Sequence, residues 1–113
     1  MPGTYKRTFG PLALTTTLTT NVYNQGSALI YDIIRHIQIV NKTASAVTFS
    51  LWIGATGANA AGTEFMGQAR SVPANGVIDW YGQLKMASTD FLVGGAGTTT
   101  ALSITGEGEQ FVV

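Results

Sequence analysis

The chain has 113 residues, of which 45% are hydrophobic and 11% charged, and its six basic side chains balance six acidic ones. This length favours a single domain with one core, and the apolar content excludes a disordered chain. Zero net charge offers no basic surface to nucleic acid or anionic lipid, whereas weak repulsion between copies favours self-association. The absence of cysteine excludes disulfides, thiolate metal sites and thiol catalysis.

The N-terminal residues 1–11 carry Pro2, Gly3, Gly10 and Pro11 around the segment TYKRTF. This composition predicts an extended arm with one short strand at most, in front of a domain over residues 12–113. The arm has no apolar run of signal-peptide length, and no segment reaches the roughly 20 apolar residues of a membrane helix. We therefore expect synthesis in the cytoplasm and no membrane partner.

Residues 28–54 give the clearest strand pattern. The Thr-rich segment before them, LALTTTLTTNVYN, indicates a half-buried strand. An extra residue near Arg35 and His36 would bring Ile34, Ile37 and Ile39 onto one face, which predicts a β-bulge there; a strand buried on both faces is the alternative. The polar turn 41–45 and the apolar alternation of residues 47–53 predict an antiparallel hairpin of residues 28–41 with 46–54. This pattern points Trp52 outward or into a second interface.

The C-terminal half repeats the same alternation. The Gly-rich residues 54–67 predict a long loop, and strands are expected before Pro73, from Val77 to Leu84, at 91–93 and at 98–105, where Leu102 and Ile104 point inward. Seven or eight strands without sustained helical periodicity predict an all-β fold. We expect a two-sheet antiparallel sandwich of the jelly-roll type.

Side chains capable of catalysis are few and scattered. His36 is the single histidine, and Arg35 and Asp32 could tune it as a base, but its position within a strand favours a structural or surface role. Glu107 and Glu109 share a strand face, and the acidic residues could in principle serve glycoside hydrolysis, yet no constellation emerges. We expect no enzyme, no catalytic residue, no metal and no cofactor.

The aromatic residues Trp52, Trp80 and Tyr81 could form a platform for sugar stacking. Packing in the core or in a subunit interface is favoured for them, since such residues dominate interfaces. A carbohydrate-binding module therefore remains an alternative.

The motif IRHIQIVNKTASAVTFSLWI is followed by a Gly/Ala-rich loop, by the turn PANG before VIDWYGQL, and by TDFLVGGAG and ALSITGEGE. In this order of elements, residues 29–109 resemble a recurrent family of small all-β virion proteins of tailed bacteriophages. The resemblance implies a head decoration or cement protein, or a small tail or fibre component, without catalysis. No catalytic residue carries over from the family to this chain.

These observations together predict a non-catalytic structural protein of a phage virion, in the first place a capsid decoration or cement protein. Its expected partner is the major capsid protein or another virion structural protein, and we expect a homo-oligomer, for which a trimer is one option. A tail or fibre-associated component is the other structural alternative. The residues expected to make contacts come from the arm, the outer face and the apolar end of the chain: Tyr5, Lys6, Arg7, Phe9, Trp52, Phe111, Val112 and Val113.

Overall fold

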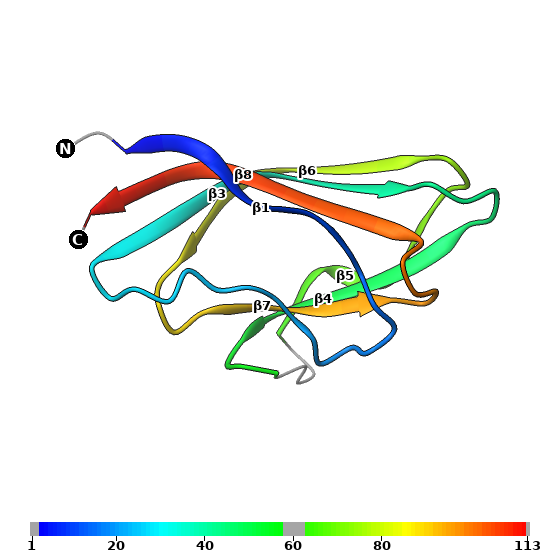
Figure 1. Cartoon of the computed structure of the whole chain (residues 1–113), viewed down its shortest axis with the longest axis horizontal. Coiled ribbons are helices and arrows are strands. Elements are labelled where there is room, and N and C mark those ends of the chain that lie inside the picture. Colours follow the sequence, from blue (N-terminus) through cyan, green and yellow to red (C-terminus); the bar gives the residue numbers. More distant parts are fainter. Residues whose placement is uncertain (1–2, 58–62, 113) are drawn as a thin grey trace.

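The computed structural model of the chain describes residues 3–57 and 63–112, and these form two layers of β-strands (Figure 1). The eight strands are β1 (Thr4–Ala13), β2 (Asn21–Tyr23), β3 (Ile30–Asn41), β4 (Val47–Gly54), β5 (Glu64–Val72), β6 (Val77–Met86), β7 (Phe91–Ala96) and β8 (Leu102–Val112). None of the described residues belongs to a helix long and apolar enough to cross a membrane.

The strand order identifies a jelly roll. One sheet has the order β1-β8-β3-β6 and the other β2-β7-β4-β5. The first strand pairs antiparallel with the last, the second with the seventh, the third with the sixth and the fourth with the fifth. This is the pattern of a long hairpin wrapped into two four-stranded sheets. The predicted all-β antiparallel sandwich of the jelly-roll type is therefore confirmed.

The predicted hairpin of residues 28–41 with 46–54 is wrong, because β3 and β4 lie in different sheets. The turn between them crosses from one layer to the other. Asn41 is buried there, and its amide donates to the Ser45 carbonyl at 2.8 Å and to the Val72 carbonyl at 3.2 Å. Both strands carry one apolar face because each contributes that face to the shared core, not because they are neighbours in a sheet.

The bulge predicted in β3 is confirmed. The register of β3 shifts between Ile34 and His36 against both of its neighbours, β6 and β8. As a result Ile34, Ile37 and Ile39 are all completely buried, whereas Arg35 and His36 both bond to side chains of the outer face. The bulge thus places two consecutive polar residues on the solvent side without turning the apolar ones out of the core.

The N-terminal segment differs from the prediction. Residues 4–13 form a ten-residue edge strand that pairs with β8, from Thr4 opposite Gln110 to Ala13 opposite Ser103, instead of an arm outside the domain. Phe9 is only 7% exposed. Its ring stacks on Tyr23 with centroids 5.1 Å apart. The strand continues through Gly10 and Pro11 because an edge strand tolerates proline and because register shifts on both sides of Phe9 absorb the irregularity.

The core lies between the two sheets and contains the inward residues of both. Phe49, Leu51 and Ile37 are fully buried there, as the alternation in the sequence predicts. At one end of the core Asp32 is only 1% exposed. It accepts hydrogen bonds from the Tyr23 hydroxyl and, at 3.2 Å, from the Gln110 amide. Because Asp32 belongs to β3 and Tyr23 to β2, this bond connects the two sheets.

Candidate functional site

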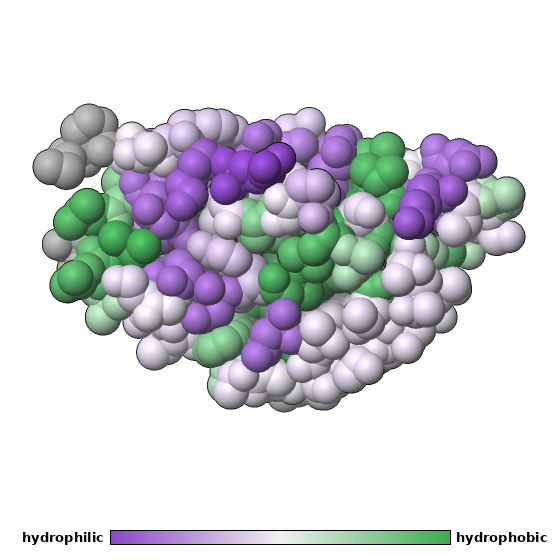
Figure 2. Space-filling model, in the orientation of Figure 1, coloured by the Kyte–Doolittle hydropathy of each residue, from purple (hydrophilic) through white to green (hydrophobic). Residues whose placement is uncertain are grey.

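The outer face of the β1-β8-β3-β6 sheet carries the three ion pairs found among the described residues. Side chains of a strand alternate between the two faces, so the outward residues of neighbouring strands align into rows. One row crosses all four strands through the paired residues Arg7, Glu107, His36 and Tyr81. Figure 2 shows polar surface along the layer to which these strands belong in Figure 1.

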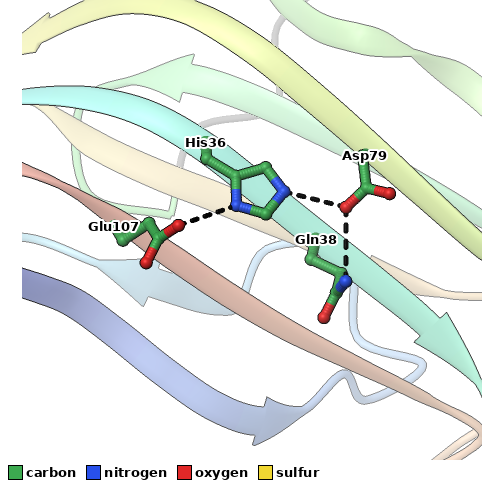
Figure 3. A network of polar contacts seen from close by, with 4 residues as sticks. All are labelled: His36, Gln38, Asp79 and Glu107. Carbon is green, nitrogen blue, oxygen red and sulfur yellow. Dashed lines mark hydrogen bonds and ion pairs between the residues drawn. The ribbon is translucent and has the colours of Figure 1, made fainter.

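His36 lies at the centre of this row, between two carboxylates (Figure 3). Its Nδ1 is 3.0 Å from Glu107 Oε1 of β8, and its Nε2 is 2.8 Å from Asp79 Oδ1 of β6. The same Asp79 oxygen accepts a 3.3 Å hydrogen bond from the Gln38 amide. The imidazole therefore connects three neighbouring strands on the outer face, and the bulge at Arg35 makes this possible by turning His36 outward.

This geometry requires a protonated imidazole. A neutral histidine has one N–H, so one ring nitrogen would direct a lone pair at a carboxylate, whereas the imidazolium donates to both. Partial burial lowers the pKa of His36, but the hydrogen bonds to Asp79 and Glu107 outweigh it and raise the pKa above its ordinary value of about 6.5. The two carboxylates therefore favour the imidazolium form of His36, and both ring nitrogens are engaged in cross-strand contacts.

Two further interactions fix the same face. Arg35 forms an ion pair with Glu109, with Nη2 and Oε1 2.8 Å apart, and the Tyr81 ring stacks on His36 with centroids 4.5 Å apart and planes 8° apart. The ion pair is partly exposed, so it contributes at most about 1 kcal/mol to stability. Tyr81 remains 73% exposed and presents a held aromatic ring to solvent.

An apolar group of side chains adjoins this face at the end of the sheet where β1 begins and β8 ends. The start of β1 and the end of β8 lie at this end in Figure 1, and Figure 2 shows apolar surface there. Phe111 stacks on Tyr31 at 5.1 Å, and Lys85 Nζ lies 4.8 Å from the centre of the Tyr31 ring. Leu29 is 74% exposed and Val112 68% exposed. We call this group, Leu29, Tyr31, Phe111 and Val112, the terminal patch.

The residues predicted to make contacts occupy different places. Tyr5 and Arg7 are exposed on the outer face, opposite Glu109 and Glu107, whereas Lys6 lies opposite Gly108 on the other side of the strand. Phe111 is half-buried and Val112 is exposed in the terminal patch, and Val113 lies outside the described residues. The burial of Phe9 in the core removes it from any surface.

Trp52 is also buried, with 3% of its surface exposed, so the expectation of an exposed Trp52 is wrong. The alternation correctly places it on the face of β4 that does not carry Phe49 and Leu51. Ser50 on the same face is buried as well, and its Oγ accepts a 2.7 Å hydrogen bond from the Ala69 N–H of β5. The outer face of one sheet is therefore covered where the sequence pattern alone indicates exposure.

The three aromatic residues of the possible sugar platform are not together. Tyr81 is on the outer face of the β1-β8-β3-β6 sheet, and Trp80 packs on the core side of the same strand, edge-on to Phe65 at 5.0 Å. Trp52 belongs to the other sheet. A platform made of all three residues is thus contradicted.

The carboxylates that bond to His36 were not identifiable as its partners from the sequence, which suggests Arg35 and Asp32 instead. Asp32 points into the core and Arg35 bonds to Glu109. The one available signal is the alternation of β8, which places Glu107 and Glu109 on one strand face as predicted; in the structure this is the outer face. Neither the pairing of β8 with β3 nor the terminal patch residues Leu29 and Tyr31 could be inferred from it.

No group of three His, Asp or Glu side chains among residues 3–57 and 63–112 is placed to hold a metal ion. Across the part of the chain that the structure describes, the surface has no pocket. Comparisons of the chain with protein-family models, with curated proteins and with solved structures give no match. The candidate site therefore consists of the outer face of the β1-β8-β3-β6 sheet, with its ion pairs and exposed aromatic rings, and of the terminal patch beside it.

Proposed function

We propose that the chain is a non-catalytic structural protein of a phage virion, a capsid decoration or cement protein that binds the major capsid protein or another virion structural protein. Its binding surface is the outer face of the β1-β8-β3-β6 sheet together with the terminal patch. The jelly roll is a fold found in viral capsid proteins and in lectins. The resemblance of residues 29–109 to small phage virion proteins favours the first of these.

One observation carries the proposal: the exposed aromatic rings Tyr5 and Tyr81 lie on a face that carries three ion pairs between its own side chains. Aromatic residues and arginine are enriched in protein interfaces, and a ring fixed by stacking, as Tyr81 is on His36, loses little entropy when it binds. Charges neutralised within the face lower the cost of covering it with a partner. The terminal patch adds apolar area at the edge of the same surface.

A copy count by mass spectrometry on purified particles of the encoding phage tests this function. A decoration protein is expected in a simple ratio to the major capsid protein. Absence from the particle, or a count of only a few copies per tail, would contradict capsid decoration; the latter count would support the tail or fibre-associated alternative.

A binding assay tests the surface. Particles lacking the protein are mixed with purified wild type or with Tyr81→Ser, which changes an exposed ring without touching the core. We expect the variant to bind at least about tenfold more weakly, as for the loss of an interface aromatic residue. Leu18→Ser is the matched control, because Leu18 is exposed outside both the outer face and the terminal patch. Equal loss in both variants would contradict the assigned surface.

A glycan-binding module is a second candidate, and one observation favours it. The exposed Tyr81 ring lies beside the Asp79 carboxylate and the Gln38 amide, and an aromatic ring with adjacent hydrogen-bonding groups is what sugar recognition uses. A glycan array tests it with wild type and Tyr81→Ala. Binding that the variant loses would establish this role, and an array without any binding would exclude it for the glycans present.

A further inference from the structure

The open edges of the two sheets differ in how they are protected against the addition of another strand. An unprotected edge exposes N–H and C=O groups that pair readily with a further strand, and proteins block it with short strands, charges, proline or bulges. Each sheet has two such edges: β1 and β6 in one, β2 and β5 in the other. Their protection can be compared directly.

Three of the four edges are either very short or combine a register shift with proline or left-handed residues. β1 has two register shifts, Pro11 and the adjacent cations Lys6 and Arg7. β2 is only three residues long. β5 shifts register against β4, with Met66 and Ala69 in left-handed conformations at φ 66° and 52°. Strand addition is therefore disfavoured at β1, β2 and β5.

The fourth edge strand, β6, is long and is interrupted by a single bulge against β3. It has ten residues and no proline, and in the described part of the chain only β3 hydrogen-bonds to it. Its odd-numbered residues are exposed, whereas Ile78, Trp80 and Leu84 on the core side are half-buried at the rim. Gly82 and Gln83 together lie opposite Arg35, and this bulge leaves the alternation of β6 intact. The strand thus offers both unpaired backbone groups and partly uncovered apolar side chains.

The side chains of β6 are complementary to those of a second, antiparallel β6. Residues directly opposite in two paired strands point to the same face, so the core-side residues of the two β6 strands can be opposite each other only if the two-fold axis passes through a residue. An axis at Gly82 brings Asp79 opposite Lys85 of the second copy, and symmetry produces this pair twice. Trp80 then lies opposite Leu84 of the second copy on the core side. A two-fold axis at Tyr81 instead pairs Asp79 with Gln83 and Lys85 with Val77, so charge complementarity selects Gly82.

We propose that two copies of this chain associate through their β6 strands, antiparallel with Gly82 opposite Gly82, so that the two β1-β8-β3-β6 sheets join into one continuous sheet. The occupant of the open edge is a second copy of the chain, and the association is a dimer and not the trimer named above as an option. It concerns the free chain in solution, so it holds or fails independently of the proposed virion function.

Disulfide trapping tests the register. The chain has no cysteine, so Tyr81→Cys and Gln83→Cys can each be made as a single-cysteine variant and mixed under mild oxidation. In the proposed register these two positions face each other, and disulfides form only when the Cα atoms are close. We expect the mixture to cross-link at least about tenfold faster than either variant alone. Fast cross-linking of Tyr81→Cys by itself, or equal rates in all three samples, would overturn the proposal.

A mixture of Tyr5→Cys and Arg7→Cys is the matched control. These exposed residues have the same spacing on the outer face of β1, the edge with blocking features. We expect the mixture to cross-link no faster than its components. A rate equal to that of the β6 pair would mean that trapping reports random collision, and would overturn the assignment to β6.

Analytical ultracentrifugation of charge variants provides a second test, without cysteines. Lys85→Glu and Lys85→Gln both remove the contact of Lys85 with Tyr31, but only Lys85→Glu faces Asp79 of the second copy with a like charge. We expect the dimer of Lys85→Glu to dissociate at about tenfold higher concentration than that of Lys85→Gln, that is, with a tenfold higher Kd for Lys85→Glu, since two like-charge pairs form per dimer. Equal dimerisation of the two variants, a monomeric wild type or a trimer would contradict the proposed pairing.

Discussion

Glu107 and Asp79 lie on strands that do not touch each other in the sheet, yet one imidazole connects their carboxylates: His36 of the intervening β3 bonds to both. The bond to each requires a proton on the corresponding ring nitrogen. Stability should therefore depend on the charge of His36, and this gives a pH-dependent test.

The folded protein should be more stable below neutral pH through His36. The pKa of His36 is higher in the folded state than in the unfolded chain, so the folded state binds its proton more tightly. This contribution is fully present below about pH 6.5, the unfolded pKa, and is lost as the pH rises through the folded pKa. The free energy of unfolding, measured in urea across this pH range, should show this pH dependence in wild type but not in His36→Gln. The same dependence in the variant would assign it to another group.

The core prediction concerns Phe49. The side chain is almost completely buried between the sheets, so Phe49→Ala should lower the free energy of unfolding by about 3–5 kcal/mol through the cavity it leaves. Thr48→Ala, at the exposed neighbouring position, should change it by no more than about 0.5 kcal/mol. Denaturant unfolding measures both. A loss under about 1 kcal/mol for Phe49→Ala would contradict the assigned facing of β4.

The β3 bulge makes an asymmetric prediction for deletions. Removing Arg35 leaves Ile34, His36 and Ile37 in regular alternation against β8, so the variant should fold, with the Glu109 ion pair lost and a wider bulge at Gly82 and Gln83 of β6. Removing Gln38 instead turns Ile39 out of the core and should prevent folding. Circular dichroism and thermal unfolding distinguish the two. Equal damage from both deletions would mean that Arg35 is not an inserted residue.

How far the sequence determines the structure differs from element to element. The spacing of Ile34, Ile37 and Ile39 predicts the bulge because only an extra residue reconciles it with one buried face. The same alternation cannot say whether β3 and β4 are neighbours in a sheet or face each other across the core, since both arrangements bury the same side. The burial of Trp52 is missed for a related reason: alternation predicts which face of β4 carries the side chain, whereas its burial depends on tertiary contacts on that face.

The site follows the same division. Alternation places Glu107 and Glu109 outward, but the partners of His36 are set by the register between strands. Glu107 is 71 positions from His36 in the sequence, and Asp79 is 43 positions from it. In the N-terminal segment, Gly10 and Pro11 suggest the end of any strand. Pairing with β8 and the burial of Phe9 override that local signal, as tertiary contacts commonly do.

Deleting residues 1–10 should therefore destabilise the sandwich strongly. The deletion removes Phe9 from the core and leaves β8 without its partner along most of β1. Loss of the Phe9 side chain alone should lower the free energy of unfolding by about 3–5 kcal/mol. Deleting residues 1–3, which precede β1, is the matched control and should leave the unfolding transition nearly unchanged. If the chain without residues 1–10 unfolds like wild type in urea, β1 contributes nothing to the fold in solution, and the segment acts as the detached arm that its glycines and prolines suggest.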